Sequence, residues 1–326
     1  MCTLWEIQMR RFSIRATLLM AALVTGLFSG PAAAQTYPAR TISMLVNSGG
    51  GALEATTRTI LDTVRANTGA TLILENRLGG GGALGLQATK RAKPDGYTYA
   101  ITFASALNLG PLINPEVDID PIKDFAPVSN MFSIGSVVVV KDDAPYKDLR
   151  DLVAAAKAKP GVPSFGVFGA GNKVWLAQIE EMTGAKFLQV PMKTSEESLT
   201  LVLGNHLQAT VATAGTAVAQ RGRIKAISFG GAKPSPLLPG VPSARDMFGM
   251  EMTSWYGVLA PAGTPSPVVE WMSRELVRAV KDPKVVKLIE DSGFTMVASS
   301  PEEFAKALRS EVDTNAAILK KYPDIR

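Results

Sequence analysis

Hydrophobic and polar positions follow two different periods along this chain. Short apolar runs, such as residues 42–46 and 136–140, are typical of buried strands. Other stretches, such as residues 53–64, gather their apolar residues close to one face of a helix. The two kinds of segment alternate from residue 41 onward, which predicts an α/β fold with parallel sheets.

The same reading places the remaining elements. We expect further strands at residues 71–75, 97–103, 165–166, 187–190, 207–212, 224–228 and 255–260. We expect further helices that end near residue 92 and lie at 148–159, 174–183 and 197–203.

The C-terminal part of the chain, from residue 267, is helical in pattern, with breaks at 282–283 and near 300–301. These helices need a sheet to cover, and the first sheet of the chain is the natural candidate. The sequence therefore predicts one lobe of residues 37–132 and 261–326, and a second lobe of residues 133–260.

A glycine-rich loop joins the first strand to the first helix. Backbone N–H groups in such a loop, together with the positive end of the helix dipole, can hold an anion. A tight turn that needs glycine only for its backbone angles explains the loop equally well. The candidate ligand-binding residues here are Asn47, Ser48, Gly49, Gly50, Gly51 and Glu54.

A second loop of the same kind precedes the helix predicted at residues 174–183. Two such loops that face each other across a cleft would hold one anion from both sides, whereas two unrelated turns are the simpler alternative. Ser105, at the end of the strand predicted at 97–103, is a further candidate. The candidate residues of the second loop are Val167, Phe168, Gly169, Ala170, Gly171, Asn172 and Lys173.

The sequence GGGGALG at residues 79–85 matches the G-x-G-x-x-G spacing of dinucleotide sites. In a dinucleotide site, an acidic residue about twenty positions further on binds the ribose. Phe103, Ala104 and Ser105 occupy that place here, which argues against a nucleotide.

Residues 1–34 have the layout of a secretory signal peptide. Three arginines precede an apolar core at residues 16–28, and three alanines at 32–34 form a small-residue cleavage site. The core is too short for a membrane anchor. Met9 is an alternative start, and no lipobox cysteine lies at the cleavage site. The only cysteine, Cys2, lies in this leader, so we expect a periplasmic protein without disulfides.

Charge and side-chain chemistry exclude several functions. Removal of the leader leaves 31 basic residues (34 − 3) and 28 acidic ones (29 − 1), a balance too mild to imply nucleic acid. His206 is the only histidine, so we expect neither a nucleophilic triad of the usual type nor a transition-metal cluster. The adjacent pairs Glu180-Glu181 and Glu196-Glu197 diverge by about 100° on a helix, so neither forms a catalytic dyad.

Several motifs resemble those of the substrate-binding proteins of tripartite tricarboxylate transporters, the Bug family. The similar region runs from residue 37 to about residue 322. The glycines after residue 77 belong to one of these motifs, which explains the apparent dinucleotide spacing without a nucleotide. The motifs are YPARTI at 37–42, ENR at 75–77, PDGYT at 94–98, KDFAPV at 123–128, WYG at 255–257, APAGTP at 260–265 and SPEEF at 300–304.

The resemblance implies a Venus-flytrap fold, with two lobes, two crossing segments and a central ligand cleft. It also implies a periplasmic monomer that binds a small organic acid, uses no cofactor and passes the acid to two integral-membrane subunits. Two alternatives stay open. One is a ligand sensor that feeds a signalling partner, and the other is an enzyme on the same scaffold with Glu54 as its acid or base.

The departures from the family pattern fall at the ligand loops. The first loop lacks the usual prolines and aromatic residue, and Thr213 stands at a usually acidic position. In the second loop, Lys173 replaces a small residue and Trp175 replaces a histidine. Lys173 either contacts a bound carboxylate or points to water, and Trp175 and Phe168 either stack on a ligand or pack in the core. Whether the ligand is still an acid stays open.

Overall fold

The computed structural model describes residues 37–47, 51–114, 116–231 and 234–321, and leaves the side chains of residues 51 and 52 undescribed. The chain divides into two units, residues 1–39 and 40–326, and the fold reported below belongs to the second. The predicted signal peptide and the loop residues Ser48, Gly49 and Gly50 lie outside the described residues.

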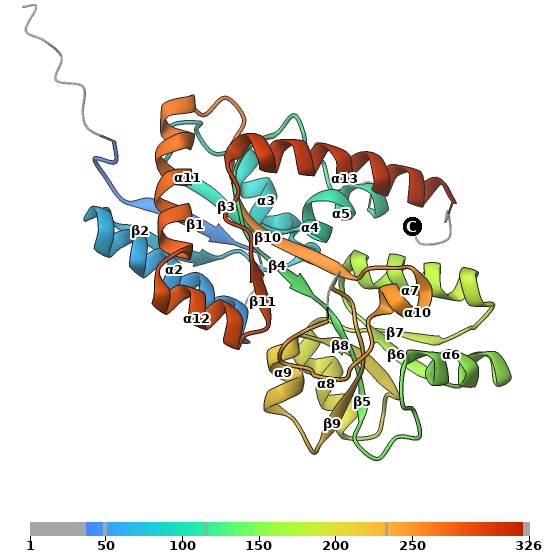
Figure 1. The fold of residues 1–326 in the computed structure, drawn as a ribbon. Helices are drawn as coiled ribbons and strands as arrows, with labels where there is room; N and C mark the ends of the chain where they lie inside the picture. Colours follow the sequence, from blue (N-terminus) through green and yellow to red (C-terminus); the bar gives the residue numbers. More distant parts are fainter. Residues whose placement is uncertain (1–36, 48–50, 115, 232–233, 322–326) are drawn as a thin grey trace, which may run out of the picture. The chain divides into compact units, whose positions relative to one another are not determined.

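A six-stranded mixed sheet contains the first strands of the chain and its last ones (Figure 1). Strands β1 and β2 and strands β1 and β3 pair in parallel, whereas β10 pairs antiparallel with β3 and β4, and β11 antiparallel with β4. In sheet order the strands are β11 (Phe294–Met296), β4 (Phe125–Gly135), β10 (Thr253–Pro261), β3 (Thr98–Phe103), β1 (Ile42–Val46) and β2 (Leu72–Asn76).

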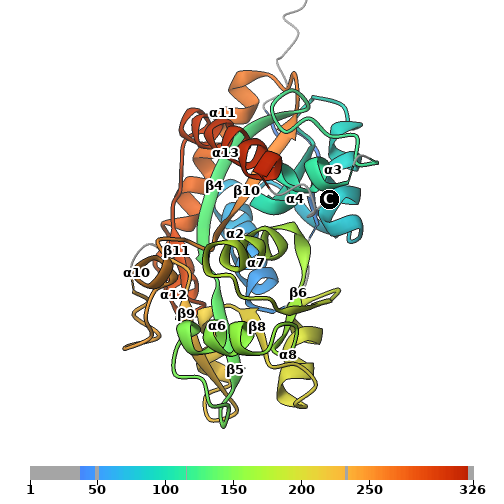
Figure 2. The same ribbon diagram turned by 90° about the vertical axis from the view of Figure 1, so that its right-hand side faces the viewer.

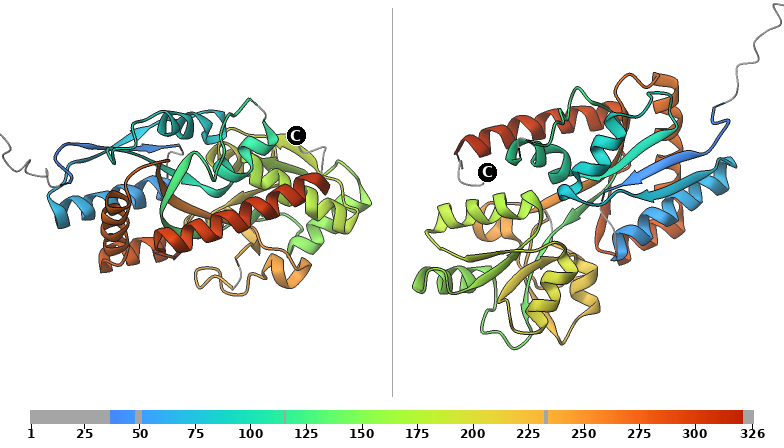
Figure 3. Two further views of the ribbon diagram at one scale, coloured as in Figure 1. Left: turned by 90° about the horizontal axis from the view of Figure 1, so that it is seen from above. Right: turned by 180° about the vertical axis from the view of Figure 1, so that it is seen from behind.

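Helices cover both faces of this sheet (Figure 3). Helices α2 (Gly51–Thr68), α11 (Ser266–Val280) and α12 (Pro283–Asp291) pack together, and α11 contacts β4. Helices α3 (Ala83–Lys90), α4 (Ala104–Asn108) and α13 (Pro301–Lys321) share one hydrophobic cluster with β3 and β10. The C-terminal helices therefore pack on the first sheet, as the sequence predicts.

The second sheet is mixed and has five strands, and its strand β5 is buried on both faces. Val138 and Val140 belong to one hydrophobic cluster, and Val137 and Val139 belong to another. All four are fully buried, because successive strand residues point to opposite faces and helices cover both. In sheet order the strands are β7 (Leu188–Pro191), β6 (Ser164–Val167), β8 (Ala209–Ala212), β5 (Val137–Lys141) and β9 (Ile224–Phe229).

The helices around the second sheet divide between its two hydrophobic clusters. On the face with Val138 lie α6 (Leu149–Ala158), α7 (Gly169–Thr183) and α10 (Ala244–Phe248). On the face with Val137 lie α8 (Ser195–Leu203) and α9 (Ala214–Ala219). The short helices α5 (Gly110–Ile113) and η1 (Gly80–Gly82) belong to the first part of the chain.

Two features differ from the sequence prediction. Both sheets are mixed rather than parallel, because β10 in one and β5 in the other run against their neighbours. Strands β4 and β11 and helices α4, α5, α9 and α10 are not among the elements that the sequence predicts. The predicted break at residues 282–283 is confirmed: Pro283 begins α12, and the Asp282 side chain caps it by accepting from Lys284 N at 2.9 Å.

The chain passes between the two sheets at Ser136, where β4 continues into β5 (Figure 2). Ser136 N donates to Met252 O at 2.9 Å, Gly230 N donates to Ser136 O at 2.7 Å, and Met252 N donates to Gly230 O at 2.8 Å. Gly230 is tightly enclosed, since a Cβ atom there would lie 2.5 Å from Met252 O. These three residues form the junction of the two sheets.

We expect Gly230→Ala to destabilise the protein by about 1–3 kcal/mol, because the added methyl group collides with two carbonyl oxygens that cannot rotate away. Gly110→Ala is the matched control: its Cβ atom would meet only Ser105 O, at 3.7 Å. Urea unfolding of the three proteins gives the comparison. Equal free energies of unfolding for the two variants would show that the junction accommodates the added methyl group without loss of stability.

Candidate functional site

Helix α4 and the first turn of α7 approach each other closely. Helix α4 starts directly after β3, and Ser105 is its second residue. A Cβ atom on Gly171 would lie 3.3 Å from Ser105 Cβ, and one on Gly169 would lie 3.9 Å from Ser105 Oγ. Glycine at these positions therefore lets the backbone of α7 come close to the Ser105 side chain. The structure thus brings Ser105 together with two residues of the predicted second loop.

The second loop is shorter than the sequence predicts, because α7 begins at Gly169 rather than at residue 174. Phe168 is the N-cap residue and supplies no side-chain hydrogen bond to the first turn. The Asn172 side chain donates from Nδ2 to Phe168 O at 2.9 Å. The first N–H groups of α7 thus carry no side-chain cap and lie at the positive end of the helix dipole.

Asn47, at the end of β1, is buried and fixed by two hydrogen bonds. Its Nδ2 donates to Thr102 Oγ1 at 2.6 Å and to Gly82 O at 3.2 Å. Its Oδ1 has no hydrogen-bond partner among the residues that the structure describes, although Asn47 is only 5% exposed. The sequence did not indicate Thr102 or Gly82, because a polar contact between residues 55 or 35 positions apart leaves no periodic signal.

Glu54 lies in the first turn of α2, next to the loop outside the described residues. Arg58, one turn further on, donates from Nη2 to Glu54 Oε1 at 2.6 Å and from Nε to the same oxygen at 2.9 Å. Both guanidinium donors therefore meet one carboxylate oxygen, and Glu54 is engaged in an ion pair within its own helix. Gly51 begins the same helix.

Lys173 and Thr213 lie in different surroundings. Lys173 is half-buried in the second turn of α7 and forms no ion pair with any residue that the structure describes. Thr213 is the N-cap of α9, where its Oγ1 accepts from Thr216 N at 3.1 Å. Gly215, two residues further on, donates from N to Ser292 O, so the start of α9 lies beside the turn between α12 and β11.

The aromatic residues of the second loop lie in or beside the core. Trp175 is 3% exposed and lies 6.3 Å from Phe165 between ring centroids. Val167 is buried in the same hydrophobic cluster, and Phe168 packs against it. Trp175 is therefore a core residue, whereas Phe168 is half-buried beside the core and stays a candidate. Ala170 packs instead in a cluster with Leu109, Val174 and Leu319.

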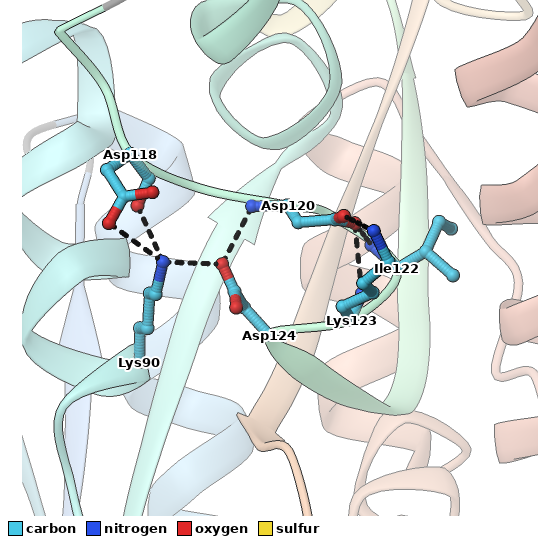
Figure 4. Close-up of polar contacts among 6 residues, drawn as sticks. All are labelled: Lys90, Asp118, Asp120, Ile122, Lys123 and Asp124. Atoms are coloured by element: carbon cyan, nitrogen blue, oxygen red, sulfur yellow. Dashed lines mark hydrogen bonds and ion pairs between the residues drawn. The ribbon is translucent and has the colours of Figure 1, made fainter.

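A cluster of charged side chains braces the loop before β4 (Figure 4). Lys90 Nζ lies 3.0 Å from Asp124 Oδ2 and 3.1 Å from Asp118 Oδ2, and these two carboxylates raise the pKa of Lys90. The Lys123 ammonium, 2.9 Å from Asp120 Oδ2, lowers the pKa of that carboxyl group. Because each of these charges has a partner, we interpret the cluster as structural.

The described part of the chain contains no group of three or more His, Cys, Asp or Glu side chains that could hold a metal ion. Two surface hollows, of about 270 and 300 Å³, lie at the C-terminal end of β5 and contain none of the candidate residues. Among the described helices, none is both long and apolar enough to cross a membrane.

The sequence of this chain matches a known protein family. A sequence model described as "Tripartite tricarboxylate transporter family receptor" matches residues 56–323. Protein BugT of Bordetella pertussis is 26% identical over 307 residues, which cover 92% of this chain and 94% of BugT.

Solved structures show the same fold. The structure of a periplasmic transporter is 31% identical, has a TM-score of 0.80, and matches 88% of this chain and 98% of that one. MatC from Rhodopseudomonas palustris, solved with bound malate, is 22% identical with a TM-score of 0.79 and matches 87% of this chain and 100% of MatC. These likenesses confirm the predicted two-lobe periplasmic binding protein fold.

The contact between α4 and α7 can be tested with a disulfide. Without the leader the chain has no cysteine, so Ser105→Cys with Gly171→Cys introduces the only two thiols. The would-be Cβ separation of 3.3 Å is only slightly below the usual disulfide range of about 3.5–4.5 Å, so we expect oxidation to join them. Thiol titration and intact mass give the result, with each single variant as the control. Two free thiols after oxidation would show that the helices lie apart in solution.

Proposed function

We propose that this chain, which belongs to the tripartite tricarboxylate transporter receptor family, captures a small organic acid in the periplasm and delivers it to two membrane subunits. Members of this family are periplasmic solute-binding proteins rather than enzymes. Delivery to membrane subunits is the role that the family name carries.

The approach of Ser105 to the first turn of α7 is the observation that carries the proposal. Uncapped N–H groups at the start of a long helix attract a carboxylate, and the Ser105 hydroxyl can donate to the same group. Gly169 is exposed and Gly171 is half-buried, and neither has a side chain that would cover this backbone. MatC, which has the same fold, was solved with bound malate, a small carboxylate.

The proposed ligand contacts come from both predicted loops. The first loop contributes Asn47, Ser48, Gly49, Gly50 and Gly51, and Glu54 supports it through Arg58. Ser105 follows β3, and Thr213 begins α9. The second loop and first turns of α7 contribute Val167, Phe168, Gly169, Ala170, Gly171, Asn172 and Lys173, mainly through the backbone except for Lys173.

The two lobes proposed from the sequence are residues 37–132 with 261–326, and residues 133–260. Both boundaries fall inside strands of the first sheet, β4 and β10, so residues 133–135 and 253–260 go with the first lobe instead, and the passage between the lobes lies at Ser136 and Met252. Bending at the junction of Ser136, Gly230 and Met252 would then open and close the lobes around a ligand.

Ligand capture is tested with the protein that lacks residues 1–34. Native mass spectrometry of the freshly purified protein identifies any retained compound, and titration calorimetry measures binding of malate and of benzoate, with glucose as an uncharged control. We expect a carboxylate to bind and glucose not to bind. Retention of an uncharged compound, with no carboxylate bound, would overturn the proposal.

Lys173 is the side chain expected to set affinity. A partly desolvated, charge-assisted contact contributes about 1.5–3 kcal/mol, so Lys173→Ala should weaken malate binding roughly ten- to a hundredfold. Lys173→Met keeps most of the aliphatic stem and should lose nearly as much, which separates charge from packing. Both variants should show less dependence of affinity on salt, because screening acts on the charge that was removed.

Lys186→Ala is the matched control for Lys173. It removes one positive charge just after α7, where the Lys186 ammonium is exposed and 3.4 Å from Glu180 Oε2. Calorimetry at two salt concentrations should show unchanged affinity for this variant. If Lys173→Ala behaves in the same way, Lys173 points to water and backbone amides alone hold the anion.

A further inference from the structure

Glu311 on α13 is half-buried in the first part of the fold, outside the proposed ligand contacts. Trp255 on β10 donates from Nε1 to Glu311 Oε2 at 2.5 Å. Removal of the Glu311 carboxyl group from water raises its pKa, although the Trp255 bond acts in the opposite direction. A group of this kind keeps its proton to a higher pH than an exposed glutamate.

Trp255 is itself held rigidly. Its side chain is 8% exposed, and its ring meets the Phe304 ring edge to face at 4.9 Å between centroids. Phe304 lies on the same helix as Glu311, two turns earlier. The indole N–H therefore fixes one side of the Glu311 carboxyl group in place.

Asn108, the last residue of α4, is the second side chain that interacts with this carboxyl group. Its side chain is fully buried and lowers the pKa of Glu311 through a hydrogen-bonding contact. Within the described part of the chain, neither amide atom of Asn108 has a hydrogen-bond partner at normal distance and angle, so the contact with Glu311 is not a fully formed hydrogen bond. A buried amide without a hydrogen-bond partner is destabilising, so Asn108 gains from any improvement of its contact with Glu311.

Helix α4 links this carboxyl group to the α7 contact. The helix has five residues, and Asn108 and Ser105 are three positions apart within one turn. We propose that Glu311 is a positioning residue, which holds Asn108 and thereby fixes α4 so that Ser105 stays against the first turn of α7. Its effect on ligand affinity rests on the proposed function, whereas its effect on the α4–α7 contact does not.

The two protonation states of Glu311 require opposite orientations of the Asn108 amide. A neutral carboxyl group donates its O–H to Asn108 Oδ1 and accepts from Trp255 Nε1. An ionised one only accepts, so Asn108 must turn its Nδ2 toward it. A buried carboxylate is also stabilised by water, which enters when α4 loosens. The ligand site is therefore held most firmly while Glu311 is protonated.

No charged side chain contributes to the surroundings that set the Glu311 pKa. Helix α4 and strand β4 carry no ionisable side chain, and Tyr256 is the only one in β10. On α13, the residues three and four positions away are all uncharged. Helix α11, which also contacts α13, carries Glu270, Arg274, Glu275 and Arg278, and Arg274 pairs with Glu275.

Glu311→Gln removes the titration and keeps an acceptor for Trp255. A raised folded-state pKa means that wild-type stability is greatest, relative to this variant, below about pH 4.5 and falls as the pH rises through the folded-state pKa. Thermal unfolding from pH 4.5 to 8 should therefore show an increasing advantage for Glu311→Gln. Asp313→Asn, an exposed change on the same helix, is the matched control and should show no such trend.

Malate affinity over the same pH range distinguishes a role of Glu311 in placing Ser105 from an effect of Glu311 on stability alone. The titration of malate itself cancels in the ratio of wild-type to Glu311→Gln affinity. We expect this ratio to fall about three- to tenfold as the pH rises through the Glu311 transition, and Asn108→Ala to remove the trend. A constant ratio beside a pH-dependent stability gap would overturn the proposal.

The cysteine pair at residues 105 and 171 gives a test without ligand. Its effective concentration, measured against glutathione at pH 7.5, should rise severalfold with Glu311→Gln and stay unchanged with Asp313→Asn. If malate does not bind but this rise is seen, the proposed ligand is wrong and the positioning role stands. An unchanged value with Glu311→Gln would overturn the positioning role whatever malate does.

Discussion

The structure depends on the point at which the continuous backbone of β4 and β5 stops pairing with strands of the first sheet and starts pairing with strands of the second. Gly135 of β4 pairs with Thr253 of β10, and two residues later Val137 of β5 pairs with Phe229 of β9. Ser136, between these two pairs, forms hydrogen bonds with Gly230 and Met252, so the two sheets are joined at this residue. The position of α4 against α7 follows from this base, because each helix begins where a strand of its own sheet ends.

Much of the fold could be predicted because buried strands and helices require apolar residues at regular spacings in the sequence. The valines of β5 are apolar without interruption since both faces of their sheet are covered, and the length of the run marks a strand. The start of α7 was missed for a physical reason. Gly169 and Gly171 disfavour a helix in isolation, but their lack of side chains lets α4 pack there, and that contact outweighs the local preference.

The candidate site was predicted less completely than the fold. Sequence spacing indicated the glycines and Ser105, because a strand followed by glycine and a helix is a local pattern. It could not indicate that Asn47 bonds to Thr102 or that Trp255 bonds to Glu311, since these partners are 55 and 56 positions apart. Polar pairs of this kind follow from strand order, and strand order was the part of the topology that the sequence left open.

The contact between α7 and the helices of the first sheet explains how the ligand loops can depart from the family pattern without loss of the scaffold. Ala170 and Val174, one turn apart on α7, pack with Leu109 and Leu319, a contact made of apolar side chains alone. Lys321 and Glu181 meet further along, at 3.3 Å, but they are largely exposed, and such pairs contribute about 0–1 kcal/mol. Burial of these apolar residues favours the approach of α4 to α7 whatever lies beside Ser105. Polar residues in the loops can therefore change with the ligand while the contact that brings the loops together stays the same.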